Sequence, residues 1–159
     1  MSLKRHLSYA QGYLELGLVG EAQAELDRLA EDDADKMEVL ALRMAVLQEA
    51  ENWTQLARVA AKVVERAPGE AGAWVTWAYA TRRAKTLAAA EAILLRAERK
   101  HPHEPTIQFN LACYACLKGD FAAARRRVDR AVALDPKFLH VAATDPDLAA
   151  LRNSETKSS

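Results

Sequence analysis

The sequence predicts an all-α fold, a solenoid of four helix-turn-helix repeats followed by C-terminal capping helices. Three prolines recur at one interval, since Pro68, Pro102 and Pro136 lie 34 residues apart. Two series of apolar residues keep the same interval: Val19, Trp53, Leu87 and Phe121, and Ala10, Met44, Ala78 and Ala112. A fixed interval of this length is typical of stacked repeat proteins and not of a single closed core.

The composition favours long helices in a protein without a membrane span. Half of the 159 residues are apolar, whereas only six are glycine and five are proline. No run of 18 apolar residues is present, so we expect no transmembrane helix. The first residues lack the apolar segment of a secretory signal, and two cysteines do not form a disulfide framework. We therefore expect a cytoplasmic protein.

The prolines set the frame of the repeats. Placing each proline near the end of a repeat gives residues 3–36, 37–70, 71–104 and 105–138. We expect these repeats to form one domain, residues 1–152, in which residues 139–152 are a terminal cap.

The first two repeats have turns of different composition. The first turns around Gly17 and ends in the acidic run from Glu31 to Asp35, where no proline marks the junction. The second turns at Glu51 and Asn52. In both, apolar residues at helical spacing follow the turn, which predicts a second helix.

The last two repeats have clearer boundaries. The third turns at Lys85 and Thr86, and Thr86 is a suitable N-cap. The fourth breaks at Gly119, because glycine readily adopts the left-handed conformation that ends helices. Its second helix stops at Asp135, because the residue before a proline is pushed out of the helical region.

The C-terminal residues are expected to form two short capping helices and a tail. The first helix covers Lys137–Ala143, and the second covers Asp147–Arg152 after the start signal Asp145-Pro146. A solenoid needs such an element to cover its last apolar face. The polar residues 153–159 are expected to be disordered.

The repeat pattern resembles the tetratricopeptide repeat (TPR) family, a 34-residue helix-turn-helix unit. The fourth repeat resembles it most, through Asn110-Leu111-Ala112, Tyr114, Lys118-Gly119-Asp120-Phe121, Ala124, Ala131 and Leu134-Asp135-Pro136. The second repeat departs most, because Arg43, Met44 and Leu56 stand where the family prefers leucine, a small residue and alanine. The resemblance implies a right-handed superhelix.

The resemblance also implies a binding site on the first helix of each repeat. One face of these helices packs on neighbours, and a second face carries stripes at i, i+4 and i+7: Leu7, Gln11 and Leu14; Ala41, Ala45 and Gln48; Val75, Tyr79 and Arg82; Phe109, Cys113 and Cys116. In the family, the first helices line a concave groove that takes peptides. The implied groove contains Leu7, Gln11, Leu42, Val75, Tyr79, Arg82, Arg83, Phe109, Asn110 and Cys113.

Such a groove predicts an adaptor that binds another protein. An apolar floor suits an amphipathic helix or an extended apolar segment. The alternative is that the stripes are internal packing. Some family members clamp acidic chaperone tails with basic residues and asparagines, but only Asn110 stands at such a position here, so we do not expect that ligand.

No catalytic residue, metal site or cofactor is indicated, and we do not expect an enzyme. Cys113 and Cys116 have C-x-x-C spacing, but they fall in the middle of a predicted helix, whereas redox pairs lie at helix N-termini. Zinc requires about four ligands in fixed geometry, and His101 and His103 are too far along the chain from the cysteines. No glycine-rich phosphate loop is present.

The charges indicate neither a nucleic-acid nor a membrane partner. Arg125, Arg126, Arg127 and Arg130 fan around a helix over about 200° at about 100° per residue, so they do not form one stripe. The net charge is zero, but residues 1–70 carry 8 Lys/Arg and 13 Asp/Glu, whereas residues 71–159 carry 14 and 9. This asymmetry makes salt-sensitive self-association an alternative to binding a foreign protein.

Overall fold

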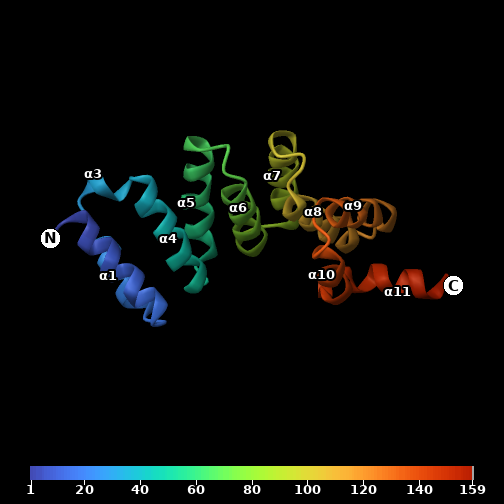
Figure 1. Ribbon diagram of the computed structural model, residues 1–159, viewed down its shortest axis with the longest axis horizontal. Coiled ribbons are helices and arrows are strands. Elements are labelled where there is room, and N and C mark those ends of the chain that lie inside the picture. Colours follow the sequence, from blue (N-terminus) through green and yellow to red (C-terminus); the bar gives the residue numbers. More distant parts are fainter. Residues whose placement is uncertain (159) are drawn as a thin grey trace. The chain divides into compact units, whose positions relative to one another are not determined.

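The computed structural model describes residues 1–158, and within them it contains helices and short connections but no β-strand (Figure 1). Four helix pairs account for most of the chain: α1 (Leu3–Glu15) and α2 (Val19–Asp27), α4 (Met37–Glu49) and α5 (Trp53–Arg66), α6 (Ala71–Ala84) and α7 (Leu87–Lys100), and α8 (Pro105–Leu117) and α9 (Phe121–Leu134). The first helix of each pair begins at the first residue of the corresponding predicted repeat. The all-α prediction is therefore confirmed.

The turns within the pairs repeat a backbone conformation as well as a sequence interval. Gly17 (φ 75°), Glu51 (φ 54°) and Gly119 (φ 84°) are all left-handed and stand at equivalent places in their repeats. The third pair differs, because α6 continues to Ala84 and Lys85 is not left-handed. Side chains cap the helices that follow three of the turns: Asn52, Thr86 and Asp120 accept from the backbone N–H three residues later.

The chain divides into two compact units, Met1–Ala84 and Lys85–Ser159. We call them unit 1 and unit 2. The boundary falls inside the third predicted repeat, so α6 belongs to unit 1 and α7 to unit 2.

Unit 1 has an apolar core between α1, α2 and α4. Ala10, Ala22, Leu26, Val39 and Val46 are fully buried there. The short helix α3 (Glu31–Ala34) forms at the acidic junction. Asp35 after it is held by Lys62 at 2.9 Å and by Arg66, both from α5.

Unit 2 is built around α8, which is apolar on all sides and therefore buried. Nine of its residues from Ile107 to Cys116 are buried. Its cover includes α9 and the C-terminal elements α10 (Phe138–Thr144), the 3-10 turn η1 (Pro146–Leu148) and α11 (Ala149–Lys157). Two predicted capping helices are thus present, with Phe138, Leu148 and Leu151 buried.

The expected disordered tail is wrong for residues 153–157, which continue α11. Leu151 is 3% exposed and anchors this helix in unit 2. Arg125 of α9 also pairs with Glu155 at 3.0 Å. Polar composition led to the wrong prediction because it does not show that a basic helix lies within reach. Ser159 lies outside the described residues.

Candidate functional site

The expected groove residues of α1 and α4 divide between the core and the surface. Leu7 and Leu42 are half-buried and pack against the core of unit 1. They therefore contribute to internal packing. Gln11 is exposed and donates a hydrogen bond to Glu15 at 2.9 Å.

The stripe of α6 presents an exposed aromatic side chain. Tyr79 is 40% exposed, and its ring meets Trp53 of α5 edge to face, with 5.3 Å between the centroids and 82° between the planes. Arg83 lies over the same Trp53 ring at 5.2 Å. Val75 and Arg82, at the other stripe positions, are half-buried. Trp53 thus holds two neighbouring residues of the predicted site.

The base of α6 is fixed by a second aromatic cluster. Trp74 is 2% exposed and donates its indole N–H to the Pro68 carbonyl at 2.9 Å. Its ring also lies 5.8 Å from that of Trp77. These contacts hold the α5–α6 connection and so orient the helix that carries Tyr79.

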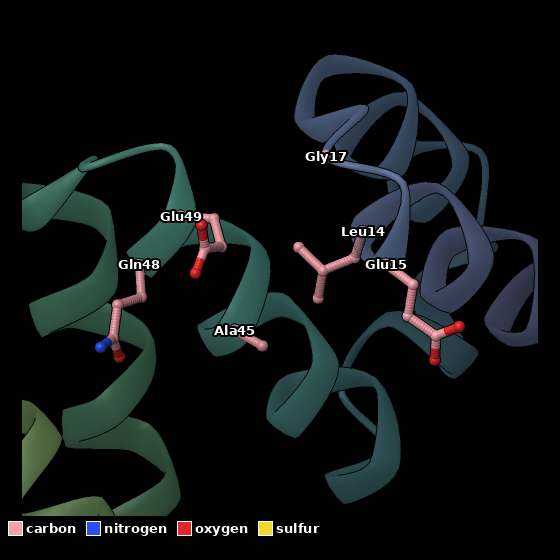
Figure 2. Close-up of a pocket in the computed structure, with 6 residues that line it drawn as sticks. All are labelled: Leu14, Glu15, Gly17, Ala45, Gln48 and Glu49. Atoms are coloured by element: carbon pink, nitrogen blue, oxygen red, sulfur yellow. The ribbon is translucent and has the colours of Figure 1, made fainter.

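A pocket of about 400 Å³ lies between the C-terminal halves of α1 and α4. Figure 2 shows Leu14 directed from α1 toward Ala45 and Glu49 of α4. Gln48, Glu15 and Gly17 complete the lining. The pocket brings together residues of two expected stripes, whereas its carboxylates were not anticipated. We call it the α1/α4 pocket.

A second pocket of about 400 Å³ lies among α4, α5 and the start of α6. Its lining is mainly apolar and includes Met44, Val63 and Ala73. Ala41 of the α4 stripe borders it, as do Glu38 and Glu70. We call it the α4/α6 pocket. No sequence motif indicated it, because it depends on three helices meeting.

The expected site residues in unit 2 are mostly covered. Phe109 is 5% exposed, and its ring lies 5.2 Å from that of Phe138 in α10. Cys113 is 3% exposed. Neither side chain is open to a ligand in this structure, because the capping elements occupy the face on which they lie. Asn110 is half-buried.

The structure places Cys113 beside two carboxylates of the cap. Ligand atoms of Cys113, Asp145 and Asp147 all lie within 4.8 Å of one another. Sequence spacing gave no indication of this group. Asp145 uses an oxygen to accept the backbone N–H of Asp147 at 2.8 Å, so its first role is to cap η1.

The arginine cluster of α9 is largely engaged within unit 2. Arg127 binds Glu98 at 2.5 Å and donates to Gln108 at 2.9 Å. Burial raises the pKa of Glu98, but the hydrogen bonds from Arg127 and Gln108 and the charge of Arg127 outweigh it, so the pKa lies below its usual value. Arg130 donates to the Pro102 carbonyl at 3.3 Å. The cluster therefore stabilises the fold.

None of the helices within residues 1–158 combines the length and the apolar character needed to cross a bilayer.

Comparisons with known proteins bear on the fold. No protein-family model matches the sequence, and no curated protein matches it. Solved structures do match. The structure titled "MamA RS-1 ArsTM double mutant" has 18% identity and a TM-score of 0.74, over 84% of this chain and 75% of that one.

Two further structures match nearly the whole chain. TTC0263, a thermophilic TPR protein of Thermus thermophilus, has 19% identity and a TM-score of 0.68, over 97% of this chain and 83% of that one. The structure titled "MamA MSR-1 C2" has 15% identity and a TM-score of 0.60, over 98% of this chain and 95% of that one. With four helix pairs whose first helices start 34 residues apart, the chain has the fold of the tetratricopeptide repeat proteins.

Proposed function

We propose that this protein is an interaction scaffold that binds a peptide or helix of another protein through the exposed faces of α1, α4 and α6. A fold does not determine a function, so the proposal depends on the surface of unit 1. The observation that carries it is Tyr79, an exposed aromatic side chain held in place by Trp53.

Tyr79 has the properties of a binding hot spot. Tyrosine, tryptophan and arginine dominate hot spots, because a large side chain in a fixed position buries much area at little cost in entropy. Here Trp53 supports Tyr79 from one side and is itself covered by Arg83. The group is therefore organised before a partner arrives.

The proposed surface is smaller than the groove that the sequence implied. It retains Gln11, Val75, Tyr79, Arg82 and Arg83, which unit 1 leaves exposed or half-exposed. It gains the two pockets beside α4. Phe109 and Cys113 are left out, because the cap covers them.

Substitution of Tyr79 by alanine tests the proposal. The full chain is immobilised, and proteins retained from cell extract are compared among wild type, Tyr79→Ala and Tyr9→Ala. Tyr9 is a matched control, because it is 43% exposed and lies beside Arg5 on α1, off the stripe. We expect Tyr79→Ala to weaken retention of specific partners by about 30-fold, the effect of a hot spot. Equal retention by both variants and the wild type would reject the surface.

Self-association is a second candidate, supported by the charges of the two units. Residues 1–84 carry 10 Lys/Arg and 13 Asp/Glu, and residues 85–159 carry 12 and 9. Opposite net charges favour head-to-tail encounter at low salt. Sedimentation at low and high salt tests this candidate, and a monomer at every salt and protein concentration would remove it.

A further inference from the structure

One face of α4 connects the two pockets of unit 1. Ala41 borders the α4/α6 pocket, and Ala45 and Gln48 border the α1/α4 pocket. Because these residues are spaced i, i+4 and i+7, they share one side of the helix. The two pockets therefore lie along one side of α4 with its small alanines between them, and we call this surface the α4 groove.

The rim of the α4 groove is acidic. Glu15 and Glu49 border one pocket, and Glu38 and Glu70 border the other. All four are exposed, and none forms an ion pair with a residue of the described chain. Some other carboxylates of unit 1 have cationic partners: Asp27 with Arg43, Asp33 with Lys36, and Asp35 with Lys62. The four rim glutamates are distinguished by their position, because they border the two pockets.

Basic groups of α6 lie at only one end of this helix. Arg82 and Arg83 are in its last turn, and Arg83 is placed over the Trp53 ring. Glu70 precedes the first turn of the same helix. Lys36, the N-cap residue of α4, interacts with Glu38 through its charge. With four glutamates beside this one lysine, the rim carries a net negative charge next to the two pockets.

We propose that the α4 groove binds a cationic amphipathic segment of a partner protein, with its apolar side chains in the pockets and its lysines or arginines against the four glutamates. This inference rests on the proposed function and specifies the partner. Charge complementarity across a rim chooses among partners and speeds their encounter.

The length of the groove sets the spacing in the partner. Glu38 and Glu49 are 11 residues apart on α4, which is about 16 Å at the rise of an α-helix. A helix that lies alongside α4 would carry its two basic positions about 11 residues apart. An extended segment would carry them about 5 residues apart.

The chain's own basic helix does not match this groove. Arg125, Arg127 and Arg130 of α9 already bind Glu155, Glu98 and the Pro102 carbonyl within unit 2. A second copy would have to break these contacts to offer its arginines. A foreign segment with unpaired basic residues is the better occupant.

Two synthetic peptides and three pairs of substitutions test the inference on the full chain. One fluorescein-labelled peptide of about 18 residues, five turns of helix, carries a leucine stripe and lysines spaced to reach both pockets, and its counterpart has glutamate for each lysine. The groove variants are Glu15→Gln/Glu49→Gln and Glu38→Gln/Glu70→Gln. The control is Glu21→Gln/Glu65→Gln, which removes the same charge from exposed positions that line neither pocket.

Fluorescence anisotropy gives the dissociation constants. We expect the lysine peptide to bind the wild type and to weaken as salt rises. Each groove pair should weaken binding about threefold and both together about tenfold, whereas the control stays within about twofold. Binding of the glutamate peptide with equal affinity, or equal effects of control and groove pairs, would overturn the inference.

The outcomes separate this inference from the proposed function. If Tyr79→Ala abolishes partner retention while the lysine peptide binds no better than the glutamate peptide, the proposed scaffold function is supported and the inference of a cationic partner is overturned. If neither peptide binds and the chain forms a saturable dimer that the groove substitutions disrupt, the occupant is a second copy and the inference is overturned.

Discussion

Replacement of Phe138 by alanine measures how firmly the cap closes unit 2. Phe138 is 7% exposed and lies against Phe109 with 5.2 Å between the ring centroids. A buried phenylalanine removes about 150–250 Å² from water, which at about 25 cal/mol per Å² corresponds to about 4–6 kcal/mol. Because the alanine side chain still buries part of this area, we expect the free energy of unfolding to fall by about 3–5 kcal/mol.

The assay must register the unfolding of unit 2. All three tryptophans lie in unit 1, so urea unfolding is followed by circular dichroism rather than by their fluorescence. Labelling of Cys113 by a thiol reagent, in a Cys116→Ala background, should accelerate because the cap no longer shields this buried thiol. Leu139→Ala is the control, since Leu139 is 66% exposed and its loss should cost less than about 0.5 kcal/mol. If Phe138→Ala lowers the free energy of unfolding by less than about 1 kcal/mol and leaves the rate of Cys113 labelling unchanged, the cap does not close unit 2 through Phe138.

Three other predictions concern the network and the turns. Because the folded-state pKa of Glu98 is lowered from 4.5, ionised Glu98 stabilises the fold above that pH, and this contribution is lost as the pH falls through the lowered value. Glu98→Gln should therefore flatten the acid branch of a curve of unfolding free energy against pH. An unchanged acid branch would contradict this role of Glu98. Glu51→Gly should raise the free energy of unfolding by about 0.5–1 kcal/mol, because φ of 54° strains an L-residue. Gly119→Ala should lower the same free energy by about 1 kcal/mol. Urea midpoints that move in the opposite directions would exclude this account. Asp120→Ala should cost about 1 kcal/mol through the lost bond to the Ala123 N–H, whereas Asp120→Asn should restore most of it in the same titration.

The sequence predicted the helices well because the signals for helix ends are local. The four first helices begin at the expected residues, and Thr86 caps α7 as expected. Prolines, caps and left-handed glycines each act within a few residues of their own position. The same interval also relates Gly17, Glu51 and Gly119 in the structure.

The candidate site was less predictable because it depends on contacts between distant segments. Helical spacing places Phe109 and Cys113 on one face of α8, but it does not show that α10 and η1 cover that face. Spacing likewise groups Leu7 with exposed Gln11, although Leu7 packs on the core. The sequence does not predict the acidic rim, because its glutamates come from separate segments of the chain.

The place where unit 1 ends affects how such an array could lengthen. A duplication of residues 71–104 would copy α6 from unit 1 and α7 from unit 2. It would leave out α5, which packs on α6, and α8, which packs on α7. A window shifted by one helix, residues 53–86, would instead copy α5 together with α6. Within the units, α5 packs with α6 and α7 packs with α8, one helix out of step with the frame that the prolines mark. Natural or engineered extension that copies such a pair keeps these within-unit contacts together.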